Sequence, residues 1–296
     1  MLKKCLNLFI TGIILTAIGG IGIATLTMNG VELNGISIVP SSSETPIVNS
    51  EMCIMPIDET QEITSLDFSA DAGVFRVVTG DSFTVETNLN TFSWEISDNC
   101  LKIENTGSNS FLNFEDVAVE IIVTIPERHF DEVKLSLNAG EFYADDIITD
   151  ELIIDMDAGE ALLNNISATT ASDITINAGE CIFQSSVLNN SEINMDAGEM
   201  IFEECKLTGE NDINLDFGEI SMTLLGKRSD YKFDINNDLG VVNVDGVPYR
   251  GEFDYTEVVI TDNGDGTVNS VEPINPIGTI KINLDLGECN IDFMEE

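Results

Sequence analysis

A short motif, Asn/Asp-Ala-Gly-Glu, recurs at a nearly constant interval through the middle of the chain and limits the folds open to it. The first copy spans residues 138–141, and the copy at residues 216–219 has Phe in place of Ala. Successive glycines are 19, 20, 19 and 20 residues apart, at Gly140, Gly159, Gly179, Gly198 and Gly218. A fixed period of this length between short alternating strands is typical of stacked β-rungs.

Each rung is predicted to bury three columns of apolar side chains. The residues five and three positions before the glycine, and four positions after it, are apolar in every regular copy. The residues between them in the preceding strand are polar, as in Ser136 and Asp155, which is the alternation of a strand with one wet face. The predicted inward residues are Leu135, Leu137, Ala144, Ile154, Met156, Leu163, Ile174, Ile176, Phe183, Ile193, Met195, Phe202, Ile213, Leu215, Met222, Ile282, Leu284 and Ile291.

We therefore expect an all-β fold, a parallel β-helix or β-roll solenoid behind a single N-terminal transmembrane helix. The expected organisation is a cytoplasmic tip and anchor in residues 1–31, a polar stalk in 32–61 and the solenoid in 62–296. Within the solenoid we expect lead-in strands in 62–130, regular rungs in 131–225 and irregular rungs in 226–296. The last rung, Gly278–Phe293, is expected to close the stack.

The N-terminus predicts the compartment. Lys3 and Lys4 precede an uncharged run, and Leu6–Met28 is long enough to cross a hydrocarbon core of about 30 Å. The positive-inside rule then places the N-terminus in the cytoplasm and the C-terminal domain outside the cell. A cleaved signal peptide is the alternative, although no small-x-small cleavage site closes the run. We expect a single-pass protein of the cell membrane.

The charge balance excludes one class of partner. The chain of 296 residues has 12 Lys and Arg against 53 Asp and Glu, which gives a formal net charge of −41. Nucleic acid is excluded because binding to phosphates requires a basic patch. Hydrophobic residues make up 43% of the chain, enough for a substantial core beneath an acidic surface.

Four features together resemble one bacterial family. They are the anchor, the polar stalk, a strand-rich lead-in ending in Val123-Thr124-Ile125-Pro126, and the repeated Gly-acid corners. This combination is similar to the "putative adhesin" or toast-rack family of domains of unknown function, over about residues 60–296. The resemblance implies a location in the cell envelope, for some members near envelope-stress signalling systems, and it brings no catalytic residues.

The glutamates of the motif form a column if the rungs stack about 4.8 Å apart. Each adjacent pair would then repel by about 0.9 kcal/mol in water. Calcium, which takes carboxylate oxygens, is one candidate to offset this repulsion, and no other cofactor is expected. The alternative is a solvated corner whose carboxylates fan apart or accept N–H bonds of the turn. The candidate cation ligands are Glu141, Glu160, Glu180, Glu199, Glu219, Asp157, Asp196 and Asp216.

Other motifs give weaker signals. Residues 261–272 are similar to an EF-hand or dockerin calcium loop, but Thr261 occupies the first place, where such loops need aspartate. A turn between two strands explains this segment better. The only histidine, His129, is expected on a connecting turn rather than as a base. Trp94 with nearby phenylalanines would form either a binding face or the core of the lead-in sheet.

The cysteines after the anchor are odd in number and lack metal-type spacing. They are Cys53, Cys100, Cys181, Cys205 and Cys289. Buried free thiols are the expected state, and a disulfide is the alternative, for which the sequence cannot choose the pair.

These observations predict a membrane-anchored extracellular module for binding, adhesion or envelope sensing. Its partners would be the membrane, through the N-terminal helix, and an envelope or extracellular protein or glycan. The alternative class is an enzyme on a β-helix scaffold, a lyase or hydrolase acting on envelope or extracellular polysaccharide. No nucleophile motif, phosphate loop or zinc motif supports that alternative.

Overall fold

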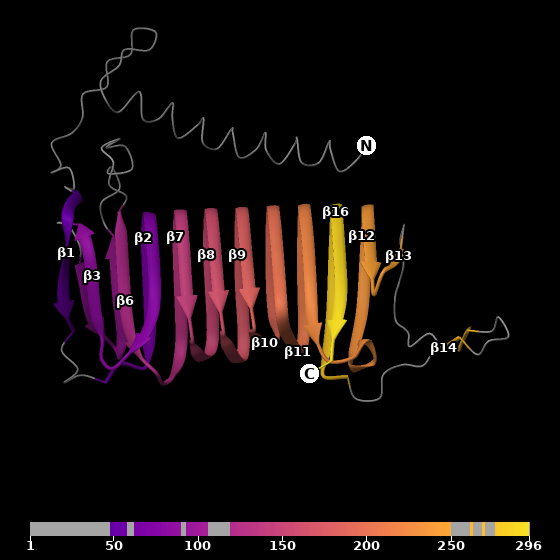
Figure 1. Ribbon diagram of the computed structural model, residues 1–296, viewed down its shortest axis with the longest axis horizontal. Coiled ribbons are helices and arrows are strands. Elements are labelled where there is room, and N and C mark those ends of the chain that lie inside the picture. The colour runs from indigo at the N-terminus through magenta and orange to yellow at the C-terminus, as the bar shows by residue number, and fades with distance from the viewer. Residues whose placement is uncertain are drawn as a thin grey trace, which may run out of the picture.

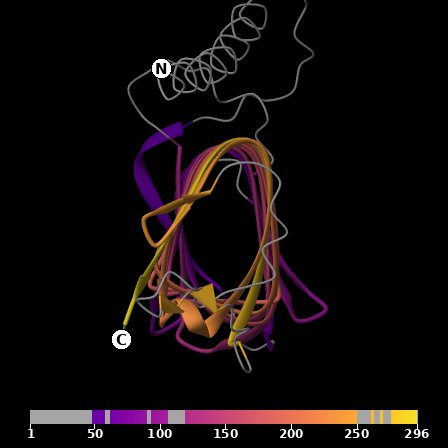
Figure 2. The same cartoon turned by 90° about the vertical axis from the view of Figure 1, so that its right-hand side faces the viewer.

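Fourteen of the described strands form one long sheet that winds into an oval tube (Figures 1 and 2). The computed structural model describes residues 48–57, 62–89, 93–105, 119–249, 261–262, 268–269 and 276–295. Over these ranges the fold is all-β, as predicted. Within these ranges, no helix is both long enough and apolar enough to cross a membrane. The predicted anchor, residues 1–31, lies outside the described residues.

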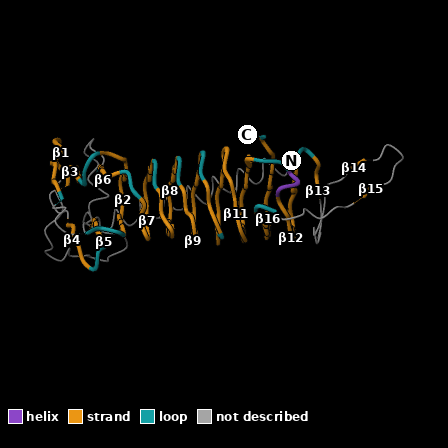
Figure 3. The backbone as a smooth tube through the Cα atoms, turned by 90° about the horizontal axis from the view of Figure 1, so that it is seen from below, coloured by secondary structure: helices purple, strands orange, loops and turns teal. Residues whose placement is uncertain are grey.

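The regular rungs follow the predicted period of 19–20 residues. Each rung runs up one side of the tube, bends at the motif glycine and returns on the other side, so that it has one leg before the glycine and one after it (Figure 2). Neighbouring rungs pair in parallel and lie side by side along the long axis (Figure 3). The strands are β7 (His129–Asp145), β8 (Ile148–Asn164), β9 (Ser167–Gln184), β10 (Val187–Asn189) and β11 (Ser191–Leu225), which contains two rungs.

The corner requires glycine for two reasons. Gly159 has φ +140° and Gly179 has φ +141°, in the region that side-chain-bearing residues rarely adopt. A Cβ added at Gly179 would also overlap the backbone carbonyl of Gly159 in the neighbouring rung. The backbones of successive corners are therefore in direct contact, and this contact sets the register of the legs.

The opposite end of each rung turns through one residue in the left-handed region. Asp146, Asn165 and Ser185 have φ values of 57°, 53° and 49°. Their N–H groups donate to carbonyls of the next rung, as from Asn165 to Gln184 at 2.9 Å. Asn and Asp tolerate this conformation better than other residues with a side chain, so the turns are compatible with the sequence.

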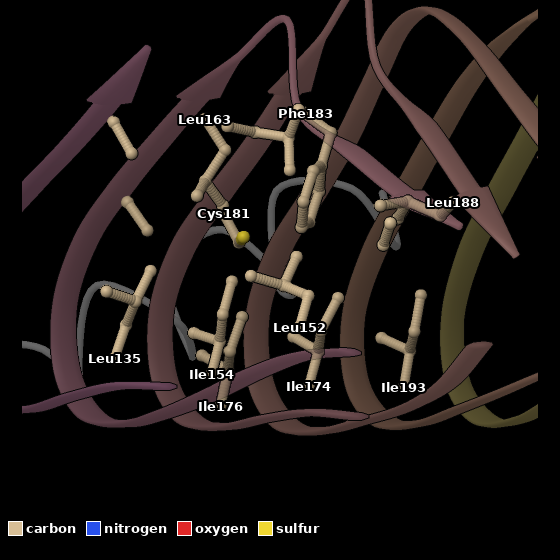
Figure 4. Packing of buried hydrophobic residues seen from close by; sticks show 14 of the residues in the cluster. Leu135, Leu152, Ile154, Leu163, Ile174, Ile176, Cys181, Phe183, Leu188 and Ile193 are labelled. Atoms are coloured by element: carbon tan, nitrogen blue, oxygen red, sulfur yellow. The ribbon is translucent and has the colours of Figure 1, made fainter. Parts of the chain in front are cut away.

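The interior contains all the predicted inward columns. Every one of those side chains is buried, and they stack rung on rung along the tube (Figure 4). The rings of Phe183 and Phe202, four positions after their glycines, stack at 5.5 Å between centroids with an interplanar angle of 9°. The alternation read from the sequence is therefore confirmed as one continuous apolar core.

The lead-in strands open the tube into two branches at its N-terminal end. The strand β2 (Ser65–Gly80) aligns Gly73 with Gly140 and forms the first rung. One of its legs pairs with β5 (Cys100–Asn105), which continues to β4 (Ser93–Ser97). The other leg pairs with β6 (Glu120–Pro126), and the branch continues through β3 (Thr84–Leu89) to β1 (Val48–Pro56).

The predicted stalk is corrected by β1. This strand comprises residues assigned to the stalk, yet it pairs antiparallel with β3. The sequence signal was hidden because Ser, Glu and Pro interrupt the apolar residues of the segment, and an edge strand tolerates such residues. The folded part therefore includes Val48–Pro56.

The C-terminal rung does not close the stack, contrary to the prediction. The strand β16 (Gly278–Met294) lies between β11 and β12 (Tyr231–Val244) and pairs in parallel with both (Figure 1). Stacking requires only an aligned glycine and matching apolar columns, and Gly287 aligns with both Gly218 and Gly240. This requirement does not depend on the order of the rungs in the sequence. The last rung can therefore pair between two earlier rungs.

The remaining elements lie beyond β11. A single 3₁₀ turn, Arg228–Asp230, precedes β12, and β13 (Val247–Tyr249) pairs antiparallel with the end of β12. The short strands β14 (Thr261–Asp262) and β15 (Val268–Asn269) pair antiparallel with each other. This pairing agrees with a turn between two strands at the calcium-like loop, most of whose residues lie outside the described ranges.

The stacked corner leads to a first prediction. Gly179→Ala should destabilise the fold by more than about 3 kcal/mol, because strain in φ adds to overlap with the next rung. Gly246→Ala is the matched control, since Gly246 has φ +74° but open space around an added Cβ. It should cost only about 1 kcal/mol. Denaturant unfolding of the full chain measures both, and equal costs would show that the corners are not in tight contact.

Candidate functional site

The motif glutamates stack along one edge of the corner. Glu141, Glu160, Glu180 and Glu199 are direct partners in the parallel register. Glu219 continues the column, because Gly218 packs against Gly198, and it is followed by one further residue, Glu288. We call these six residues the Glu file: Glu141, Glu160, Glu180, Glu199, Glu219 and Glu288.

Two members of the Glu file, Glu180 and Glu199, oppose folding when they are ionised at neutral pH. Burial raises the pKa of Glu180 above its usual value, and the neighbouring Glu160 raises it further. Burial likewise raises the pKa of Glu199, with added repulsion from Glu219 and Glu180. These carboxyl groups ionise less readily in the folded chain than in the unfolded one, so their ionisation opposes folding.

The rungs at both ends show that the fold does not require glutamate at this position. Val74 stands beside Glu141 at one end of the file, and Val241 stands beside Glu288 at the other. The same backbone corner is built in both rungs, with Gly73 and Gly240 in register. The six carboxylates are therefore an addition to the fold and not a condition for it.

The predicted aspartates form a second column, on the other side of the glycines. Asp157, Asp196 and Asp216 are exposed there, and Asn177 donates to Asp157 at 2.8 Å. Among the described residues, no group of three or more His, Cys, Asp or Glu side chains is arranged to hold a metal ion. Calcium remains a prediction of the sequence, and any ion would have to sit between neighbouring carboxylates.

A column that the sequence analysis missed lies beside the Glu file. Three positions after the glycine, in the same outward-facing leg, four successive rungs place apolar side chains in register. All four side chains are partly exposed. The next rung has Ser221 at this position. We call this column the apolar strip: Tyr143, Leu162, Ile182 and Ile201.

Alternation could have revealed the apolar strip. The polar residues between inward positions were identified only in the leg before the glycine. In the leg after it, the inward-facing residues are two and four positions after the glycine. The outward-facing residue between them is also apolar, as in Cys181-Ile182-Phe183. A strand with one wet face should have a polar residue at Ile182.

The far side of the apolar strip is a column of paired amides and carboxylates. The amide of Asn164 donates to Asp145 at 3.1 Å, and the amide of Gln184 donates to Glu203 at 3.2 Å. In this column the two carboxylates are separated by the two amides, so no like charges are adjacent. The strip is therefore bordered by the Glu file, with its six adjacent carboxylates, on one side and by hydrogen-bonded pairs on the other.

The N-terminal end of the strip carries a positive charge. The guanidinium of Arg76 lies 4.1 Å from the ring centroid of Tyr143 and 3.5 Å from a carboxylate oxygen of Glu120. The hydroxyl of Tyr143 donates to Glu141 at 2.9 Å, and this hydrogen bond raises the pKa of the tyrosine. Arg76, on the lead-in strand β2, thus ends the apolar strip on this side.

The other candidate residues form no site. His129 begins β7, where its Nε2 lies 3.1 Å from Asp150 at the surface, rather than on a connecting turn. Trp94 packs against the core, in agreement with the second of its two predicted roles. All five described cysteines are free thiols. Burial raises the pKa of Cys205 and Cys289 to about 12 and that of Cys181 as well, so these thiols are inert.

Comparison with known proteins gives one family and several solved structures. The family model described as Toastrack DUF4097 matches residues 57–283. A "putative cell adhesion protein" from Clostridium sporogenes is 19% identical, covers 82% of this chain and 99% of its own, and has a TM-score of 0.37. Two structures each described as a "putative adhesin" are 10% identical. The one from Bacteroides fragilis covers 82% of this chain and 98% of its own at a TM-score of 0.35. The one from Parabacteroides distasonis covers 83% of this chain and 98% of its own at a TM-score of 0.34. No curated protein matches.

The Glu file leads to a second prediction. Glu180→Gln with Glu199→Gln should stabilise the chain at pH 7 by about 1 kcal/mol at low ionic strength, after allowing for solvent screening. Both pKa values are raised in the folded state, so the gain is full above them and vanishes as the pH falls below the ordinary value of 4.5. Thermal unfolding across this pH range measures it.

The control for this prediction is Asp155→Asn. Asp155 is exposed in the rung of Glu160, but its partners in register are Ser136 and Thr175, so it has no like charge beside it. Its effect should stay within about 0.5 kcal/mol at every pH. An equal gain from this variant would mean that total charge, and not the Glu file, opposes folding.

The same measurement tests the calcium prediction. Calcium that binds only the folded chain adds about 2.7 kcal/mol at one hundred times its dissociation constant. A calcium site therefore predicts a rise in the unfolding midpoint that magnesium at equal ionic strength does not produce. The variant Glu160→Gln/Glu180→Gln/Glu199→Gln should lose that rise. Equal effects of both ions would leave screening as the explanation.

Proposed function

The chain belongs to the Toastrack DUF4097 family, and on this premise we propose that it is a non-enzymatic binding module of the cell envelope. The N-terminal segment anchors it in the membrane, and the solenoid-like sheet is held outside the cell. There it serves adhesion or envelope sensing by contacting an envelope or extracellular partner. The partner presents cationic groups to the Glu file.

The observation that carries this proposal is the retention of the Glu file against its cost. Val74 and Val241 fill the same position in other rungs, so folding alone gives no reason for carboxylates there. Features that oppose stability without serving the fold are typical of functional surfaces. A cationic partner would offset the negative charge of the Glu file. Relief of the repulsion between its carboxylates would then favour binding.

Among the described residues, neither histidine nor cysteine is placed for catalysis. The chain has one histidine, and His129 pairs with Asp150 at the surface. The buried cysteines have raised pKa values, which disfavours the nucleophilic thiolate. Within the described residues these observations disfavour catalysis by histidine or cysteine, while the choice of binding over the polysaccharide-acting enzyme rests on the Glu file.

A third prediction tests the extracellular location. Cys53 is exposed, whereas Cys181, Cys205 and Cys289 are buried. A membrane-impermeant maleimide added to intact cells should therefore label the full chain, and Cys53→Ser should remove most of the label. Labelling that appears only after the cells are permeabilised would place the domain inside and overturn the proposed location.

A fourth prediction tests the binding surface. At physiological salt, where the Debye length is about 8 Å, a fluorescent octalysine probe should bind the full chain partly through the Glu file. Glu160→Gln/Glu180→Gln/Glu199→Gln should weaken its binding by about threefold or more. The matched control removes three carboxylates from the leg before the glycine, by Asp155→Asn, Asp173→Asn and Glu192→Gln. Equal losses of octalysine affinity in both variants would show that the probe binds negative charge in general and not the Glu file.

A further inference from the structure

The two legs of each rung differ on their outer faces. On the leg before the glycine, the outward column four positions before it contains Ser136, Asp155 and Thr175, which are polar. On the leg after the glycine, the apolar strip occupies the outward column. The two legs lie on opposite sides of the tube (Figure 2). Along the regular rungs, the strip column therefore exposes adjacent apolar side chains to water, and the polar column of the other leg does not.

A partner cannot reach this strip by adding a strand to the sheet. The central strand β8 pairs along its length with β7 on one side and β9 on the other. Its backbone N–H and C=O groups are used within the sheet, whereas strand addition requires a free edge. Any partner of the strip must dock through side chains on the face of the sheet.

The spacing of the strip suits an α-helix laid along the tube. Rungs repeat at about 4.8 Å, so four rungs extend over about 14 Å. A helix rises about 5.4 Å per turn, and three turns extend over about 16 Å. A helix parallel to the long axis would therefore place about one apolar side chain beside each rung, from positions i, i+4, i+7 and i+11.

The charge beside the strip determines which side chains are favoured along one edge of that helix. Glu160, Glu180 and Glu199 run parallel to Leu162, Ile182 and Ile201, two residues away in each strand. On the other border, the carboxylates of Asp145 and Glu203 are separated by two amide side chains, so the negative charge is less dense there. Cationic side chains are thus favoured along one edge of a docked helix, the edge over the Glu file.

We infer that this face, the apolar strip with the Glu file, docks an amphipathic helix of a partner protein that carries lysine or arginine along one edge. This inference rests on the proposed binding function and names the chemistry of the partner. The docked length is limited to the strip, because Arg76 lies over Tyr143 at one end and Ser221 follows Ile201 at the other. A helix of about three turns covers this length.

Two other occupants fit the face less well. A second copy of this chain would bring another Glu file and a formal charge of −41 against the first. An anionic membrane surface would be repelled by the same carboxylates. A basic helix is favoured by both parts of the face, through burial of apolar surface and through opposite charge.

The test uses the full chain and a synthetic helix as the probe. The probe has about 18 residues, with leucines at four positions spaced as above and lysines along one edge. Fluorescence anisotropy at physiological salt measures its dissociation constant. Leu162→Thr/Ile182→Thr/Ile201→Thr should raise that constant about tenfold. Threonine is β-branched, as Ile182 and Ile201 are, and suits a strand at Leu162 as well, and the unfolding midpoint of the variant verifies that the sheet is intact.

Control variants and probes separate the parts of the inference. Asp155→Asn/Asp173→Asn/Glu192→Gln changes the opposite leg and should alter the constant by less than about twofold. A probe with glutamate in place of lysine should not bind. A probe of the same composition interrupted by prolines, which cannot form the helix, should bind at least about tenfold more weakly.

Three results would overturn the inference. One is equal binding of the helical probe to the wild-type chain and the threonine variant. Another is equal binding of the helical and proline-interrupted probes. The third is self-association in sedimentation that the threonine variant loses, which would make a second copy the occupant. If octalysine still distinguishes the glutamine variant in any of these cases, the proposed function stands and the helix is rejected. If octalysine does not, both fall.

Discussion

The direct contact between stacked glycines at the corner is the constraint on which the rest of the structure depends. At Gly159 and Gly179 the backbones of successive rungs lie so close that no side chain fits between them. Because the corner cannot shift, each position of the motif falls on the same position of the next rung. Columns of like residues follow directly, apolar in the core and acidic outside.

The same register that stacks favourable contacts inside also stacks unfavourable charges outside. In the core it aligns Phe183 with Phe202, and on the surface it aligns Glu180 with Glu160 and Glu199. The fold could avoid the repulsion with a neutral residue, as the rungs at the ends do. The acidic column and its apolar neighbour thus form a surface whose composition the core does not explain, and the proposed binding function would use it.

The inward columns and the Glu file were predictable because they depend on local rules. Alternation determines which side chains face inward, and the constant period aligns them. Three features did not follow from these rules. Val48–Pro56 pairs with β3, and the residues of Val48–Pro56 do not by themselves specify this partner. Gly278–Met294 inserts between earlier rungs because Gly287 fits beside both Gly218 and Gly240. The apolar strip emerges only when outward residues of separate rungs are brought together.

The sequence by itself determined the rung, its inward side chains, its glycine corner and the acid beside it. These depend on residues within about twenty positions of one another, where backbone geometry and alternation act directly. Only the tertiary structure decided the order of the rungs and the make-up of the outer face. Several rungs satisfy the same register, so local chemistry cannot choose the neighbour of Gly287. Ile182 likewise acquires its place in a strip only from the rungs on either side.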